Sequence, residues 1–111
     1  MDDYYKNFTK YTSEISNEQN KLENQLSNLK ETKGERAYYY EFEKKIKENL
    51  NYFDELVGKL EEAYSNKNVP MSMPASLLDE RQDEIKKFNI TYGKIKQELD
   101  DIMREKIFSS N

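Results

Sequence analysis

The chain contains no cysteine, no histidine and no tryptophan. Without Cys or His, disulfide frameworks and the common zinc sites are excluded. The same absence removes Ser–His and Cys–His nucleophile pairs and every histidine general base. We therefore predict no catalytic residue, no cofactor-binding residue and no metal ligand, and we expect that the protein is not an enzyme.

Glycine and proline are scarce, with three and two residues among 111, so turns are few. No run of about 18 apolar residues exists that could cross a membrane. The opening letters MDDYYKNF are acidic and lack the basic and apolar regions of a secretory signal. Charged residues make up 36% of the chain, which together with few turns is typical of long amphipathic helices.

The net charge of −4 is spread evenly along the chain. No segment forms a basic patch, so the electrostatic footprint of nucleic-acid binding is absent. Attraction to anionic membrane surfaces is disfavoured for the same reason. We expect this segment itself to contact neither nucleic acid nor membrane.

Three segments show the periodicity of amphipathic helices, at about residues 2–33, 35–65 and 75–108. In each segment apolar residues recur mostly at alternating steps of three and four. We call the row of apolar residues on one side of each helix its stripe. A single helix would expose its stripe to solvent, whereas three helices packed side by side bury their stripes in one shared core. We predict an all-α fold in which residues 1–111 form a single up-down-up antiparallel three-helix bundle. The stripes are Tyr4, Phe8, Tyr11, Ile15, Leu22, Leu26 and Leu29; Tyr39, Phe42, Ile46, Leu50, Phe53, Val57, Leu60 and Tyr64; and Leu78, Arg81, Ile85, Phe88, Tyr92, Ile95, Leu99 and Ile102.

The three glycines weaken or end the helices. Gly34 follows Lys30 and Lys33, and a basic last turn before Gly predicts a helix end with the glycine in the left-handed conformation. Gly58 and Gly93 lie inside the second and third segments, where each costs about 1 kcal/mol relative to Ala.

The stretch SNKNVPMSMPAS, residues 65–76, predicts a loop, because its two prolines oppose a continuous helix. Met71 and Met73 are apolar within this polar connection. We expect them to plug one end of the bundle, with a hook for a partner as the alternative. Ser76 with Asp79 fits a capping box at the start of the third helix.

Three consecutive tyrosines occur in AYYYEFE. Tyr39 belongs to the stripe, so Tyr38 and Tyr40 are predicted to point partly outward. A half-exposed tyrosine is a good interface anchor because it combines a large area with a polar tip, although an ordinary amphipathic rim explains it as well. The candidate partner-binding residues are Tyr4, Tyr5, Tyr38 and Tyr40.

Arg81 occupies a stripe position on the core face of the third helix. One interpretation is a side chain near the end of the bundle that reaches solvent or pairs with an acidic residue of the first two helices. The other interpretation is that Arg81 recognises a ligand.

The stretch NVPMSMPASLLDERQDEIKKF carries the most specific similarity to a known family. A third helix that opens with Leu78, Arg81 and Ile85 after a loop with Asn and Pro resembles the N-terminal (Habc-like) three-helix domain of SNAREs of the syntaxin-six type. The acidic and aromatic start MDDYYKNF is also similar to that group, although its proline is missing. The resemblance covers the whole chain in length and helix rhythm, and the start of the third helix in detail.

The resemblance implies a regulatory, protein-binding domain of a trans-Golgi or endosomal t-SNARE. Its expected partners are SNAREs or tethering-complex subunits, and its expected place is the cytoplasmic face of Golgi and endosomal membranes. The domain is expected to be a monomer, with a fusion motif and a membrane anchor following in a longer chain beyond Asn111. The alternative is a helical coiled-coil subunit of a larger multiprotein assembly, because such regular stripes could also pair between chains.

Overall fold

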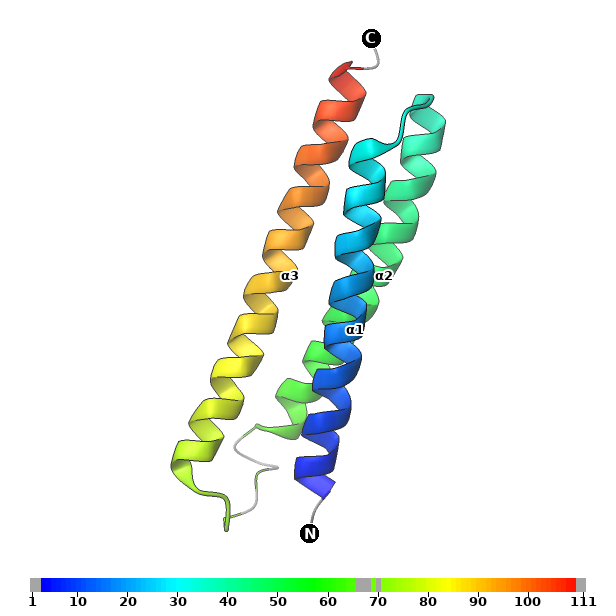
Figure 1. Cartoon of the computed structure of the whole chain (residues 1–111). Helices are drawn as coiled ribbons and strands as arrows, with labels where there is room; N and C mark the ends of the chain where they lie inside the picture. Colours follow the sequence, from blue (N-terminus) through cyan, green and yellow to red (C-terminus); the bar gives the residue numbers. More distant parts are fainter. Residues whose placement is uncertain (1–2, 66–68, 70, 110–111) are drawn as a thin grey trace.

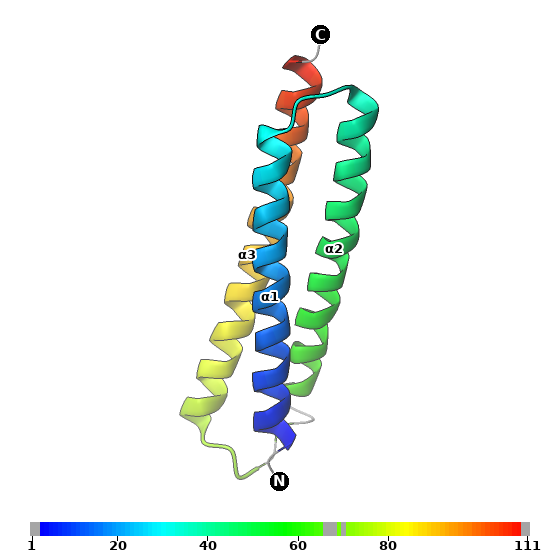
Figure 2. The same cartoon turned by 45° about the vertical axis from the view of Figure 1, so that its right-hand side comes forward.

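Three helices and their connections make up the described part of the structure, a computed structural model in which residues 3–65, 69 and 71–109 are described. The helices are α1 (Asp3–Glu31), α2 (Arg36–Ala63) and α3 (Ala75–Ser109). The chain runs up, down and up again (Figures 1 and 2), which confirms the all-α three-helix bundle. The bundle is a rod of 60 × 18 × 18 Å, and the helix ends lie within two residues of the sequence-based bounds.

Most of the core consists of residues of the predicted stripes, and Leu56, Met73 and Met103 complete it. Among the described residues none that is buried as a whole is polar or charged, although single side-chain atoms of Glu18 and Arg81 are buried. Stripe residues at the edge of the core, such as Tyr11, Phe42 and Tyr92, are partly buried against it. The fully buried side chains are Tyr64, Phe53, Ile15, Leu22, Leu26, Leu29, Ile46, Leu56, Leu60, Leu99 and Val57.

The turn between α1 and α2 corrects one prediction. Gly34 does not adopt a positive φ, so the expected left-handed helix end is wrong. Gly34 instead lies close to two tyrosines: its N–H donates to the Tyr39 hydroxyl at 2.9 Å, and a Cβ there would meet the Tyr38 ring at 3.4 Å. A Cβ at Gly34 would make only an ordinary van der Waals contact with the Tyr38 ring.

The end of α3 is tied to the same turn. The Lys106 ammonium donates to the carbonyl oxygens of Lys30 at 2.7 Å and Thr32 at 2.6 Å, and it lies over the Tyr39 ring. The Arg36 guanidinium donates to the Ile107 carbonyl at 3.3 Å. These cations bond to carbonyls that helix ends leave without intrahelical partners. They thereby hold the end of α3 against the turn between α1 and α2.

The loop at the lower end corrects a second prediction. The Leu78 N–H bonds the Pro74 carbonyl at 3.0 Å, so α3 already begins at Ala75 and Ser76 lies inside its first turn. The predicted capping box of Ser76 and Asp79 is therefore wrong. Proline is tolerated at a helix start because its missing backbone N–H is not needed for an intrahelical hydrogen bond there. Met73 is buried, whereas Met71 is 104% exposed. Only Met73 is placed as the predicted plug.

We expect Gly58→Ala and Gly93→Ala each to raise the free energy of unfolding by about 0.5–1 kcal/mol. Both glycines lie inside helices, and a Cβ at either position meets no atom within 4 Å. Urea unfolding of the single and double variants measures the gain, which should be additive for distant sites. Gly34→Ala is the control and should bring no gain. A double variant no more stable than the wild type would contradict this prediction.

Candidate protein-interaction surfaces

The upper end of α2 displays the predicted pair of tyrosines. Tyr38 and Tyr40 are each 49% exposed, while Tyr39 between them is buried. Residues two positions apart on a helix point about 200° apart, so Tyr38 and Tyr40 lie on opposite flanks of α2. The structure does not bring them together, and one flat partner surface could not cover both.

Tyr38 lies on the α1-facing flank of α2, where Asn49 donates to Gln25 of α1 at 3.0 Å. Its ring meets Phe42 edge to face, with centroids 5.5 Å apart. It also lines a shallow, open hollow at the turn. The rest of that hollow comes from Thr32, Lys33, Gly34, Glu35, Ala37 and Glu41. Tyr38 is therefore a half-exposed aromatic side chain held beside an ordered turn, which suits an interface anchor.

Tyr4 and Tyr5 belong to the first turn of α1. Their side chains lie outside what the structure describes. Their assignment as partner-binding residues stays a prediction.

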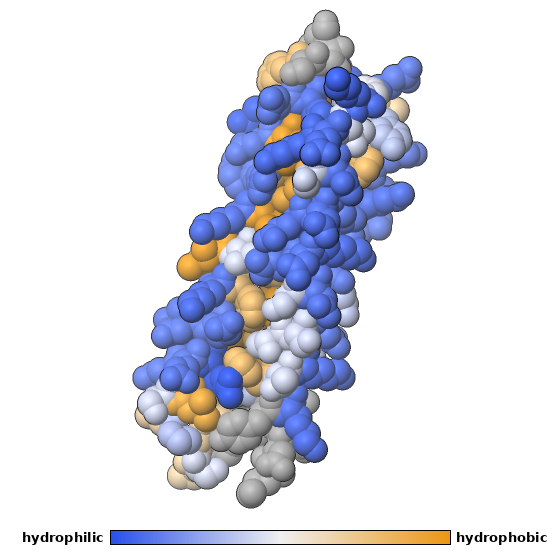
Figure 3. All heavy atoms as spheres, viewed as in Figure 1, coloured by the Kyte–Doolittle hydropathy of each residue, from blue (hydrophilic) through white to orange (hydrophobic). Residues whose placement is uncertain are grey.

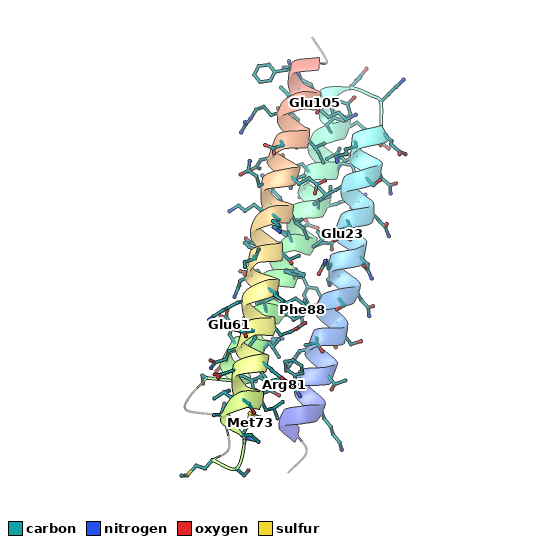
Figure 4. The ribbon with its side chains drawn as sticks, turned by 60° about the vertical axis from the view of Figure 1, so that its left-hand side comes forward. Glu23, Glu61, Met73, Arg81, Phe88 and Glu105 are labelled. Atoms are coloured by element: carbon teal, nitrogen blue, oxygen red, sulfur yellow. The ribbon has the colours of Figure 1, made fainter. Side chains whose placement is uncertain are left out.

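A stack of three side chains closes the lower end of the bundle. The Phe8 and Tyr64 rings meet edge to face with centroids 5.4 Å apart. The Arg81 guanidinium carbon lies 3.7 Å from the centroid of the Phe8 ring, which is cation–π geometry. Figure 4 shows Arg81 and Phe88 between α3 and α1. Phe8 comes from α1, Arg81 from α3, and Tyr64 is the residue that caps the C-terminal end of α2.

Arg81 does not pair with an acidic residue in the part of the chain that the structure describes. It is half-buried, and its Nε is buried without a hydrogen-bond partner. The expected acid pairing is therefore absent from the described residues, and an aromatic face takes its place.

The remaining large exposed apolar side chains are scattered. Tyr52 lies on α2, Met71 in the loop, and Ile90 and Phe108 on α3. Ile90 and Phe108 are 18 residues apart, which is about 27 Å along a helix. Among the side chains that the structure describes, these residues therefore form no single apolar patch.

The contact between α1 and α3 is the least extensive of the three helix pairs. We call the surface along this contact the α1–α3 seam, with flanks defined by Lys30 of α1 and Glu98 of α3, whose charged groups are 3.1 Å apart. Figure 3 shows apolar side chains along a strip between the two helices. At its upper end a hollow is lined by Lys30, Ile102, Glu105 and Lys106. Sequence reasoning did not identify this surface.

Comparison with known proteins gives no relative: no family profile, curated protein or solved structure matches the chain. In the described ranges, no helix is long and apolar enough to cross a membrane. Those ranges also contain no group of three or more acidic, His or Cys side chains that could hold a metal ion.

Proposed function

We propose that this chain is a non-catalytic, protein-binding module, and that it is the N-terminal regulatory domain of a trans-Golgi or endosomal t-SNARE. The observation that carries the proposal is a core closed within one chain. The buried residues of all three helices form one cluster, so the outer faces are left to bind partners. The Leu78, Arg81 and Ile85 opening of α3 supports the SNARE assignment by resemblance.

The closed core also bears on the choice between a module and a coiled-coil subunit. A coiled-coil subunit needs an apolar stripe that faces another chain. Here the stripes face one another, and the exposed large apolar residues are scattered. This arrangement supports a monomeric module that recruits SNAREs or tethering-complex subunits on the cytoplasmic face of Golgi and endosomal membranes.

Proximity labelling in cells of the source organism tests the proposal. The chain is fused to a biotin ligase, and the labelled proteins are identified. We expect SNAREs or tethering-complex subunits among them. A labelled set without trafficking proteins would overturn the SNARE assignment. Light scattering on the purified chain should give one 13.3 kDa subunit, and a stable oligomer would favour the coiled-coil assembly instead.

Tyrosine variants locate the surface in the same experiment. Tyr38→Ser and Tyr40→Ser remove half-exposed rings, while Tyr52→Ser is a matched control on the same helix with 43% exposure. Interface anchors often cost more than 1 kcal/mol when truncated. We therefore expect at least one of the first two variants to reduce labelling by about tenfold and the control to leave it unchanged. Equal labelling by all three would remove Tyr38 and Tyr40 from the interface.

A further inference from the structure

We infer that the last turn of α3 regulates the partner surface at Tyr38, and that Lys106 is the positioning residue through which it acts. The inference rests on the proposed function, in which Tyr38 is a candidate interface anchor. The surface is the hollow at the turn between α1 and α2, whose lining includes Thr32, Gly34 and Tyr38. We call it the turn hollow.

Helix α3 contributes no side chain to the lining of the turn hollow. All lining residues lie between Thr32 and Glu41, at the end of α1, in the turn and at the start of α2. The C-terminal end of α3 nevertheless lies at the same end of the rod as this turn (Figures 1 and 2). Lys106 belongs to the last turn of α3, so it can act on the surface only by holding the residues that form it.

Lys106 reaches the turn hollow first through the end of α1. Its ammonium group donates to the carbonyl oxygens of Lys30 at 2.7 Å and Thr32 at 2.6 Å, and hydrogen bonds from a charged donor are the stronger kind. Thr32 is also bound to its own helix, because its N–H and its hydroxyl both donate to the Asn28 carbonyl. The lining residue Thr32 is therefore fixed between α1 and α3.

A second series of contacts runs from Lys106 through α2. The same ammonium group lies 5.4 Å from the centroid of the buried Tyr39 ring, within cation–π distance. The Tyr39 hydroxyl accepts the Gly34 N–H at 2.9 Å, and the Tyr38 ring lies beside Gly34. Lys106, Tyr39, Gly34 and Tyr38 thus form a continuous series of contacts from α3 to the candidate anchor.

Both series of contacts start at one ammonium group, so release of that group would loosen the turn hollow on two sides at once. A partner would then have to order Tyr38 and the turn on binding, which lowers affinity. Linkage also works in reverse: a partner that binds the ordered hollow makes the last turn of α3 harder to open. The state of the α3 end and the occupancy of the turn hollow therefore regulate each other.

Amide hydrogen exchange on the intact purified chain tests the positioning role. Lys106→Met removes the charge and the donors but keeps an unbranched apolar side chain. We expect the ratio of the Gly34 exchange rate to the Phe53 exchange rate to rise about tenfold, because the turn then opens locally. Phe53 lies in the core of α2. A general loss of stability would speed both amides together and leave the ratio unchanged.

A conservative variant and a control accompany this measurement. Lys106→Arg keeps the charge and the donors, so its ratio should stay within about twofold of the wild type. Lys96→Met removes an ammonium group from an exposed position of the same helix, ten residues or about 15 Å before Lys106. This control should leave the ratio unchanged.

Proximity labelling with the same variants tests the regulation. We expect Lys106→Met to reduce labelling about as much as Tyr38→Ser, by about tenfold, and Lys106→Arg to retain it. An unchanged exchange ratio in Lys106→Met would overturn the inference whatever the labelling shows. Full labelling by Lys106→Met beside a loss in Tyr38→Ser would overturn it as well. Full labelling by both variants would instead remove Tyr38 from the interface and the regulation with it, so a failure of the proposed surface is told apart from a failure of Lys106.

Discussion

Phe53→Ala is expected to lower the free energy of unfolding by about 3–5 kcal/mol, the usual cost of truncating a core phenylalanine. Phe53 is fully buried in the middle of α2 and belongs to the single core cluster. Removal of the ring loses apolar burial and leaves a cavity that rigid neighbouring helices fill only partly. Urea unfolding followed by circular dichroism measures the change. A loss of this size is a large fraction of the stability of a small domain.

Tyr52→Ala is the matched control for this prediction. Tyr52 precedes Phe53 on the same helix but is 43% exposed, so its truncation should cost less than about 1 kcal/mol. Both variants place Ala, a strong helix former, in the interior of α2. If the two variants lost the same stability, the stripe through Phe53 would not be the core of the bundle.

The fold could be predicted because the spacing of the apolar residues indicates which side of each helix is buried. Steps of three and four keep residues on one side of a helix, and Ile46, Phe53 and Leu99 at such positions are fully or almost fully buried. Arg81 also occupies a position with this spacing, although a charged residue is unusual in a core. Its guanidinium packs on the Phe8 ring, so the position still contributes a contact between helices.

The helix ends were less predictable because their signals are weak and tertiary contacts override them. A capping interaction contributes about 1 kcal/mol, which neighbouring groups can outweigh. The turn at Gly34 is shaped by the Tyr39 hydroxyl and the Tyr38 ring. The start of α3 is set by Pro74 rather than by Ser76. In both cases the deciding group lies outside the short motif from which the prediction was made.

Of the candidate surfaces, one could be predicted from the sequence and one could not. The partial exposure of Tyr38 and Tyr40 follows from their positions beside the buried Tyr39. In the structure each of the two side chains is 49% exposed. The α1–α3 seam could not be predicted, because periodicity shows which residues are buried but not which helix pair is packed least. The Lys30–Glu98 ion pair places Glu98 beside α1, a contact that the spacing of the apolar residues could not predict.

Tyr64→Ala should destabilise the bundle by about 3–5 kcal/mol, the cost of a lost core aromatic, and should loosen its lower end first. Tyr64 is 1% exposed and packs edge to face on Phe8, whose ring also carries Arg81. Its loss removes the aromatic contact between α1 and the C-cap of α2. The Phe8 ring, on which Arg81 of α3 lies, thereby loses one neighbour. The upper end keeps the bonds of Lys106 to the end of α1.

Amide hydrogen exchange resolves this difference between the two ends. In Tyr64→Ala, protection should fall most at the start of α1 and the start of α3, and less near Lys30 and Lys106, because proteins open in local cooperative units. Tyr64→Phe keeps the ring pair and should cost only about 1 kcal/mol for the lost hydroxyl. An equal loss of protection at both ends would mean that the rod opens as one unit. The Phe8–Tyr64–Arg81 stack would then have no separate role at the lower end.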